Sequence, residues 1–298
     1  MILIDDGSND DTLSICHTYA ASDPRVKVIH KENGGHTSAR NEGLRNSSGE
    51  YVIFLDSDDW LEKDVLEICQ TDIAENHYPD IIVFRIYNTF TKKNYTNNIP
   101  DGLYHCHKGY DEILGSLLLN ESGSSTFIKG LIGKAFKKII IEDNQMTVPH
   151  ELRLAEDAAA FVASIIDSTT ISVNSNAQYF YFVREGSISH SSDRNALLRL
   201  PYMFEYYRKK FNTCAYDFSK QFERYIVAQL YTAALLSIRS GANRNRINSD
   251  LDVILKDNCV LLALSNAKFN LKGYKFILKK FILRHRLWGF AKLLDRIG

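Results

Sequence analysis

The segment Tyr51-Val-Ile-Phe-Leu55 leads directly into Asp56-Ser-Asp-Asp-Trp60, so an apolar run ends in three carboxylates within four residues. Like charges this close repel each other unless something neutralises them. A hard divalent cation such as Mg²⁺ or Mn²⁺ prefers oxygen ligands and often bridges to a phosphate group of a substrate. The stretch therefore predicts a buried strand followed by a metal-diphosphate site at Asp56, Asp58 and Asp59.

The same acidic turn also has a purely structural interpretation. A carboxylate at the start of a helix can accept hydrogen bonds from the first free backbone N–H groups. Asp58 or Asp59 could therefore cap a helix that begins at Leu61. The residues of the turn alone do not separate the metal site from the helix cap.

Composition places the chain among ordinary globular proteins. It has 298 residues, of which 45% are hydrophobic and 24% charged, enough for one large or two small domains. The formal net charge is zero, which argues against a general binder of nucleic acid. Five widely spaced cysteines, an odd number, fit a reducing cytosol. With no signal peptide and no apolar run of roughly 20 residues, we expect a protein on the cytoplasmic side of the membrane.

Short apolar runs alternate with helical patterns over residues 1 to about 86. The expected strands cover residues 2–4, 26–29, 51–55 and 80–86, and the expected helices cover residues 12–21, 37–44 and 61–74. This alternation predicts an α/β fold with a doubly wound, mostly parallel sheet. Ligands of such sheets bind beyond the carboxyl ends of the strands. We therefore expect the Asp5-Asp6 turn and the Asp56–Asp59 turn to face one crevice.

The first acidic turn and the glycine-rich segment that follows it bear on what this crevice could bind. Asp5-Asp6-Gly7-Ser8 is a tight turn whose carboxylates could bind a nucleotide or simply shape the turn. Gly34-Gly35 permits close backbone approach, and the helix behind it favours anions at its N-terminus. Arg40 on that helix is expected either to support a bound nucleotide or to pair with a carboxylate.

These motifs together resemble those of family 2 glycosyltransferases. The matching segments are Asp5-Asp-Gly-Ser-x-Asp-x-Thr12, Asn33-x-Gly-x-x-x-Ala-Arg-Asn-x-Gly-Leu44, Gly49-Glu-Tyr51 with Leu55-Asp-Ser-Asp-Asp59, Gly133–Lys138, Glu156-Asp157 and Tyr181–Ile188. The resemblance covers residues 2 to about 190. It implies a GT-A-type domain that binds a nucleotide sugar, most similar to the bacterial enzymes of capsule, exopolysaccharide and lipopolysaccharide synthesis.

The resemblance also implies a role for each matching residue. Asp58 and Asp59 would hold Mg²⁺ or Mn²⁺. Apart from the resemblance, His190 lies in a stretch rich in Gly and Ser and is either an extra metal ligand or a surface histidine without a role. Asp157 would be the general base that deprotonates the acceptor hydroxyl, oriented by Glu156. The implied transfer inverts the sugar, the implied donor is a nucleotide sugar, most commonly of UDP, and the acceptor is a glycan or a lipid-linked molecule. The implied nucleotide-sugar-binding residues are Asp5, Asp6, Arg40, Asp56 and Arg184.

One departure from the family pattern raises a second hypothesis. Family members have a further strand, turn and helix before the Asp-Asp-Gly-Ser strand, so an N-terminally truncated sheet with an open edge is expected here. A catalytically impaired remnant or interaction module that retains the fold is therefore the alternative to an active transferase. A metal-dependent phosphoesterase would also use clustered acids, but it would not require the later motifs.

The chain is expected to divide into residues 1–194, which bind the nucleotide sugar, and residues 195–298, which form a helical region. Expected helices cover residues 197–211, 218–239 and 247–255. The tail beyond residue 267 has nine Lys and Arg residues against one acid, Asp295, with aromatic and aliphatic residues between them. Such a basic amphipathic tail predicts peripheral contact with an anionic membrane, or a helix that packs on its own domain with a solvated basic face.

Overall fold

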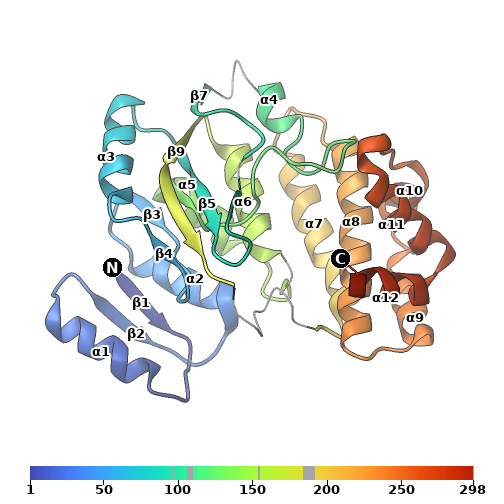
Figure 1. Ribbon diagram of the computed structural model, residues 1–298, viewed down its shortest axis with the longest axis horizontal. Coiled ribbons are helices and arrows are strands. Elements are labelled where there is room, and N and C mark those ends of the chain that lie inside the picture. The colour runs from blue at the N-terminus through green and yellow to red at the C-terminus, as the bar shows by residue number, and fades with distance from the viewer. Residues whose placement is uncertain (96, 106–109, 154, 184–191, 298) are drawn as a thin grey trace.

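The computed structural model describes residues 1–95, 97–105, 110–153, 155–183 and 192–297. An α/β part comes first in the chain, and a group of helices follows it (Figure 1). The elements of the α/β part, in chain order, are β1 (Ile2–Asp5), α1 (Thr12–Ser22), β2 (Lys27–His30), α2 (Gly35–Asn46), β3 (Tyr51–Ile53), β4 (Trp60–Leu61), α3 (Val65–Glu75), β5 (Ile81–Asn88), β6 (Lys93–Tyr95), β7 (Gly102–His105), α4 (Tyr110–Leu114), β8 (Lys134–Lys137), α5 (Lys138–Met146), α6 (Glu156–Asp167) and β9 (Thr170–Tyr181).

A seven-stranded mixed sheet forms the centre of the α/β part. Its main strands follow the order β3-β8-β5-β9-β4, with β6 beside β5 and β7 beside β9. Strand β5 runs parallel to β9 and antiparallel to β8. The α/β class with a mixed sheet is therefore confirmed, but the expected mostly parallel pairing is wrong: among the described strands of this sheet, only β5 and β9 pair in parallel.

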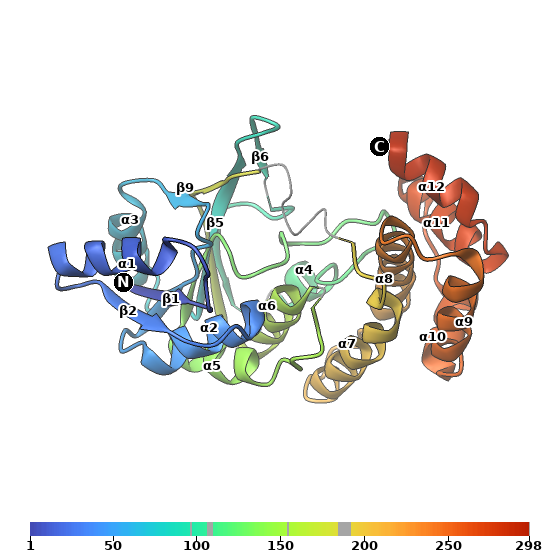
Figure 2. The same ribbon diagram turned by 90° about the horizontal axis from the view of Figure 1, so that it is seen from below.

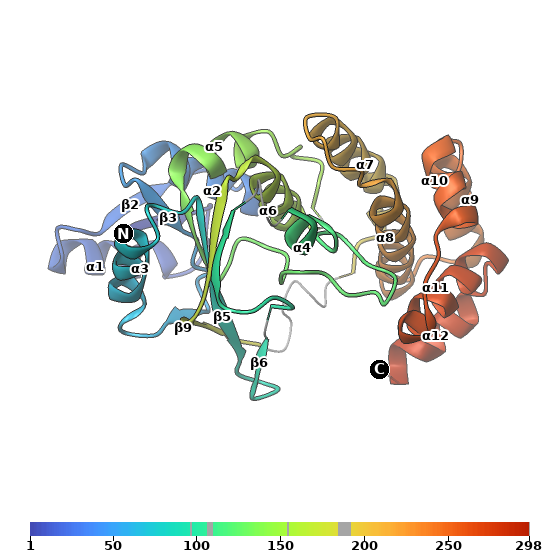
Figure 3. The same ribbon diagram turned by 90° about the horizontal axis from the view of Figure 1, so that it is seen from above.

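The two faces of this sheet belong to different cores. Ile81 and Val83 of β5 pack in the larger core, together with side chains of α5 and α6. Ile82 and Phe84 pack in a smaller core with Val65 of α3. Because successive side chains of a strand point to opposite faces, one continuous apolar run fills both cores. Figure 3 shows α5 and α6 on one side of the sheet and α3 on the other.

Strands β1 and β2 form a separate, two-stranded parallel sheet, in register from Ile2 opposite Lys27 to Asp5 opposite His30. The sequence predicts one continuous sheet, and here the structure differs. In the described part of the chain, β1 pairs with β2 alone and β3 with β8 alone. Helix α2 connects the two sheets because it packs against β1 and also against α5.

The helix expected from residue 61 begins four residues later, at Val65, with Asp64 at its N-cap. Trp60 and Leu61 instead form β4, which pairs antiparallel with β9. The ring of Trp60 stacks on that of Phe180 in β9, with 5.2 Å between the ring centroids. This pairing explains the difference, because residues that pair with a strand cannot also form the first turn of a helix. The interpretation of Asp58 or Asp59 as the cap of this helix is therefore wrong.

From residue 196 to residue 297 the chain is mainly helical, as expected. Its elements are α7 (Ala196–Phe211), α8 (Ser219–Arg239), α9 (Arg244–Ile254), α10 (Asn258–Asn266), the 3₁₀ turn η2 (Leu271–Gly273), α11 (Tyr274–His285) and α12 (Trp288–Ile297).

Helix α8 is the centre of this helical part. It packs against α7 on one side and against α10, α11 and α12 on the other. Figure 2 shows α7 and α8 between the α/β part and the outer helices. The larger core continues from α6 through α7 into α8. The division into residues 1–194 and 195–298 as separate domains stays a prediction.

Among the helices within the described residues, none combines the length and the apolar character needed to cross a membrane.

Asp80, directly before β5, connects three strands of the main sheet. Its carboxylate accepts hydrogen bonds from Thr169 N at 2.7 Å, from Thr169 Oγ1 at 2.8 Å and from Lys137 Nζ at 3.0 Å. Burial favours the neutral acid, but these donors outweigh it and lower the pKa of Asp80. The charged form of Asp80 therefore stabilises the fold.

We predict that Asp80→Asn lowers the free energy of unfolding at neutral pH by about 2 kcal/mol, because the substitution removes the buried negative charge that accepts hydrogen bonds from Lys137 and Thr169. The folded-state pKa lies below the unfolded-state value of about 3.9, so the wild-type advantage is present above that pH and is lost as the pH falls towards the folded-state pKa. Urea denaturation across this range measures the effect. The exposed Asp64→Asn is the control, and an Asp80→Asn deficit that stays constant into acid would contradict the prediction.

Candidate active site

The first acidic turn is held by strand β2. Asp5 is only 2% exposed, and its Oδ2 lies 2.6 Å from Nδ1 of His30, its register partner on β2. Ser8 N also donates to Asp5 Oδ1 at 3.3 Å. Hydrogen bonds from Ser8 and His30 lower the pKa of Asp5 despite its burial. Asp5 therefore shapes the turn that presents its neighbour, Asp6.

Asp6 connects this turn to the start of α2. Its carboxylate accepts hydrogen bonds from Lys31 Nζ at 2.6 Å, from Gly34 N at 3.0 Å and from Gly35 N at 2.7 Å. Burial opposes ionisation, but these donors lower the pKa of Asp6. Gly7 makes the close approach possible: its φ is +76°, and a Cβ at this position would lie 2.8 Å from Asn33 N.

The second acidic turn is anchored to β9 by Asp59. Asp59 Oδ2 accepts a hydrogen bond of 2.5 Å from the hydroxyl of Tyr179, and Oδ1 accepts one of 2.7 Å from Phe182 N. The hydroxyl oxygen of Tyr179 also accepts a hydrogen bond from Asp56 N at 3.3 Å. Burial, followed by the charges of Asp56 and Asp58, raises the pKa of Asp59 above its ordinary value. Both oxygens of Asp59 are thus engaged by protein donors.

Arg40 brings the second acidic turn together with the start of α6. Its Nη2 lies 3.5 Å from Asp56 Oδ1, and its Nη1 lies 3.2 Å from Glu156 Oε1. Burial would lower the pKa of Arg40, yet that pKa is raised. The charges responsible are those of Asp157, Asp56 and Glu156. Of the two roles expected for Arg40, the structure contains the pairing with carboxylates.

Asp157 occupies the first turn of α6, next to Glu156. Its Oδ1 accepts a hydrogen bond from Ala158 N at 2.7 Å. Its Oδ2 faces Gly130, where an added Cβ would lie 2.8 Å from that oxygen. Burial and the charge of Glu156 raise the pKa of Asp157, whereas Arg40 and Lys134 act in the opposite direction. Ala158–Ile166 are buried, so Asp157 is fixed to a rigid helix.

Lys134 is a member of this group to which the sequence assigned no role. It is 1% exposed, its Nζ donates to the carbonyl of Ile132 at 3.0 Å, and it lies 4.5 Å from the ring centroid of Phe161. Burial lowers the pKa of Lys134 to about 7, while the charge of Asp157 acts to raise it. Phe161 follows Asp157 by one turn of α6, so the buried ammonium packs against α6 one turn beyond the acid. The signal in the sequence was the family-like segment Gly133–Lys138, which contains this lysine.

Helix α2 connects all of these groups. Its first residues bind Asp6, and Arg40 further along binds Asp56 and Glu156. Arg184 and His190 lie outside the described residues. Within the described ranges, no three His, Cys, Asp or Glu side chains are placed to hold a metal ion by themselves. The oxygen atoms of Asp56 and Asp58 are nevertheless the donor type that Mg²⁺ and Mn²⁺ prefer.

The first part of the chain matches a known family. Residues 1–140 match the sequence model described as Glycosyl transferase family 2. Residues 1–140 belong to this family. The family 2 segment includes both acidic turns, Arg40 and Lys134, and it ends before Glu156-Asp157.

Two similar proteins are bacterial. The glycosyltransferase GlyA of Streptococcus pneumoniae is 31% identical over 193 residues, which are 63% of this chain and 27% of GlyA. The poly(ribitol-phosphate) beta-N-acetylglucosaminyltransferase TarP of Staphylococcus aureus is 28% identical over 256 residues, 84% of this chain and 73% of TarP. The chain thus spans about a quarter of GlyA and most of TarP.

Solved structures support the fold of the chain. The crystal structure of S. aureus TarS 1-349 in complex with UDP has a TM-score of 0.55 and 21% identity, and the match covers 77% of this chain and 61% of that one. The complex of TarS 1-349 with UDP-GlcNAc has a TM-score of 0.54 and 19% identity, and covers 97% of this chain and 82% of that one. At this identity the likeness establishes the fold alone.

We predict that Arg40→Met lowers the free energy of unfolding by about 2 kcal/mol at neutral pH, because Asp56 and Glu156 lose their shared cation. The loss should be smaller than the roughly 3–5 kcal/mol of a fully buried pair, since the Asp56 side chain is 41% exposed. Adding Glu156→Gln should recover part of the loss. Urea denaturation of the two single variants and the double variant measures this coupling, and strictly additive losses would contradict the bridge.

Proposed function

We propose that this chain is a metal-dependent inverting glycosyltransferase, which moves a sugar from a nucleotide-diphosphate donor to a glycan or lipid-linked acceptor in the synthesis of cell-surface polysaccharide. The observation that carries the proposal is the Asp56–Arg40–Glu156 bridge. It holds the second acidic turn, the candidate site for the donor diphosphate, beside the start of α6, which carries the candidate base Asp157. Family 2 membership of residues 1–140 supports the reaction class. The TarS complexes with UDP and UDP-GlcNAc support a UDP-sugar as the first donor to test.

On the donor side, the two acidic turns would serve different parts of the nucleotide sugar. Asp6 accepts protein hydrogen bonds on both oxygens, so we assign it to holding the Gly34-Gly35 pair beside the nucleotide base. Asp56 would contact the ribose or metal-bound water. Asp58 would hold Mg²⁺ or Mn²⁺ together with the donor diphosphate. When bound, the cation stabilises the negative charge of the departing nucleoside diphosphate. We assign Asp59 to the support of this turn, because both of its oxygens accept protein hydrogen bonds.

On the acceptor side, Asp157 would take the proton of the attacking hydroxyl. Burial raises its pKa, which makes the carboxylate a stronger base than an exposed aspartate. From the described residues, Oδ2 receives no hydrogen bond, whereas Oδ1 is engaged by Ala158 N. Glu156 would orient the site through Arg40. One base opposite the leaving group fits a single displacement, which inverts the anomeric carbon.

A second candidate is a protein that retains the fold and has lost transfer activity. The observation in its favour is that β1 and β2, which carry the Asp5-Asp6 turn, lie outside the main sheet. A donor would then bind weakly or not at all. For either candidate we propose a location on the cytoplasmic side, where nucleotide sugars are available.

A pair of variants tests the roles of Asp58 and Asp157. We expect titration calorimetry to detect UDP binding that requires Mn²⁺, and we expect Asp58→Ala to abolish it. Asp157→Asn should bind UDP and Mn²⁺ as the wild type does. Its release of UDP from UDP-GlcNAc, with water as acceptor, should fall by a factor of about 10² to 10⁴, typical of a lost general base.

Asp64→Asn, on the same surface segment, is the matched control and should behave as the wild type does. Wild-type protein without any metal-dependent UDP binding would support the second candidate. Metal-dependent binding with normal UDP release by Asp157→Asn would refute only the assignment of the base.

A buried lysine variant tests the electrostatics of Asp157. Lys134 lowers the pKa of Asp157, so Lys134→Met should raise that pKa and move the acidic limb of the pH–rate profile to higher pH. Lys129→Met is the matched control, because Lys129 is also buried but its Nζ bonds the carbonyl of Leu118 and lies over the ring of Tyr225. The control should leave the acidic limb in place. Equal shifts in both variants would show that the effect is structural.

A further inference from the structure

The last two helices present apolar side chains to solvent as well as to the core. On α11, Ile282 and Leu283 are buried, whereas Tyr274, Ile277 and Phe281 are exposed at a spacing of three and four residues. This spacing places the three exposed side chains in one stripe along the helix. Phe281 is 50% exposed, although the helix has already buried its opposite side.

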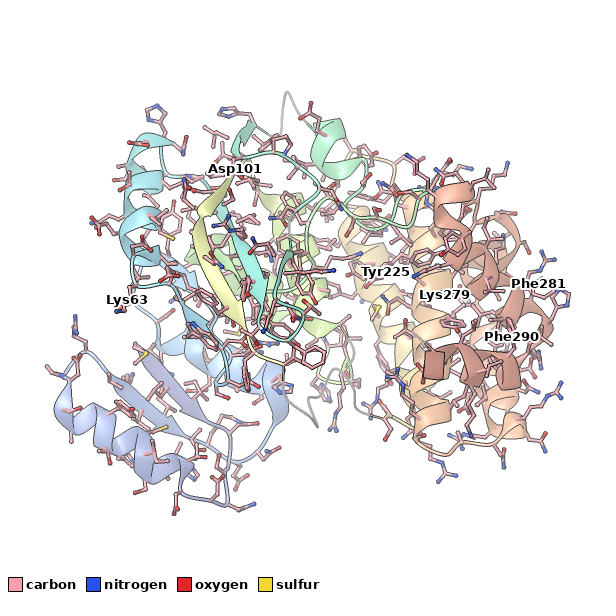
Figure 4. The ribbon with its side chains drawn as sticks, in the orientation of Figure 1. Lys63, Asp101, Tyr225, Lys279, Phe281 and Phe290 are labelled. Carbon is pink, nitrogen blue, oxygen red and sulfur yellow. The ribbon has the colours of Figure 1, made fainter. Side chains whose placement is uncertain are left out.

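The same pattern continues through the link into α12. Trp288 and Ala291 are buried, and Leu287, Phe290 and Leu293 are exposed. We call the six exposed side chains of both helices the outer face: Tyr274, Ile277, Phe281, Leu287, Phe290 and Leu293. Figure 4 shows Phe281 and Phe290 at the outer margin of these helices, while Lys279 lies on the side towards α8. An exposed apolar set of this kind marks an interaction surface.

Exposed cations surround the outer face. Lys272, Lys275, Arg284 and Lys292 are exposed and form no ion pair within the described residues. Asp295, the sole acid beyond residue 267, is engaged by Arg239, with 2.6 Å between Nη2 and Oδ1. The surroundings of the outer face therefore carry a positive charge that the chain itself does not neutralise.

Other cations of the tail are turned to the protein. Lys279 lies over the ring of Tyr231 on α8, and Lys280 Nζ donates to the carbonyl of Ala267 at 2.6 Å. The two helices therefore separate their basic residues into an inner set that packs and an outer set that flanks the apolar stripe. A helix that merely packs on its own domain would also leave cations in solvent, but it would not need the exposed apolar stripe between them.

The chemistry of the outer face selects one partner among three. A second copy of the chain would bring two sets of like charges together, which is unfavourable. Single-stranded nucleic acid stacks on aromatic rings, but Ile277, Leu287 and Leu293 offer none. An anionic bilayer satisfies both features, because its headgroups attract cations and its interfacial zone accepts apolar side chains.

We propose that the outer face of α11 and α12 binds the surface of an anionic membrane, with both helices lying along the lipid headgroups. The apolar side chains enter the interfacial zone, and the flanking lysines and arginine contact anionic headgroups. The proposal does not rest on glycosyl transfer, since none of these residues belongs to the acidic site.

Vesicle co-sedimentation of the full chain tests the proposal. We expect binding to phosphatidylcholine vesicles that contain roughly one third phosphatidylglycerol, weak binding to pure phosphatidylcholine, and loss of binding at high salt. The double variant Phe281→Ser/Phe290→Ser should bind at least tenfold more weakly. Lys275→Gln, Arg284→Gln and Lys292→Gln should each weaken binding to the anionic vesicles by up to about fivefold.

The matched control is Phe90→Ser, which removes an exposed phenylalanine of the α/β part and should bind as the wild type does. A measurement without outer-face variants uses Trp288, adjacent to Leu287, in a Trp60→Phe background. Brominated anionic lipids should quench its fluorescence.

Three results would overturn the proposal: no binding of the wild type to anionic vesicles, equal binding by the phenylalanine variants, or a self-association that Phe281→Ser/Phe290→Ser abolishes. Displacement from vesicles by a short single-stranded oligonucleotide at low concentration would likewise favour nucleic acid as the partner.

Discussion

The structure of the candidate site depends on the compensation of negative charge by one guanidinium. Asp56, Glu156 and Asp157 would repel each other if they met without a cation. Arg40 lies between them, and its raised pKa reflects their combined field. Because Arg40 belongs to α2, the position of that helix between β1 and α5 decides where the acids can meet.

A second balance concerns Asp157 itself. Burial favours its neutral form, while Arg40 and the buried Lys134 favour the charged form. The pKa of this candidate base is therefore set by opposing influences, each supplied by a different element: α6 buries Asp157, α2 brings Arg40 and β8 brings Lys134. Positions of this kind are typical of functional carboxylates, whose pKa values are tuned by environment rather than by residue type.

Much of the secondary structure could be predicted from the local pattern of apolar residues. The apolar run at Ile81–Phe84 and the helical segments after residue 195 formed where expected, because burial follows periodicity. The segment at Trp60-Leu61 was misjudged as the start of a helix, since its pairing with β9 depends on residues more than a hundred positions away. For the same reason the contact of Asp59 with Tyr179 had no local signal.

The sequence by itself determined the α/β class, the family 2 motifs and the candidate acids, because residue type and short-range spacing carry that information. Only the tertiary structure decided which acids share a cation: Arg40 and Glu156 are 116 residues apart. It also decided that Lys134 is buried below Asp157 and that apolar side chains of α11 and α12 face outward. These outcomes depend on how elements pack, since a side chain's partners, and with them its pKa and exposure, are set by neighbours that are distant in the chain.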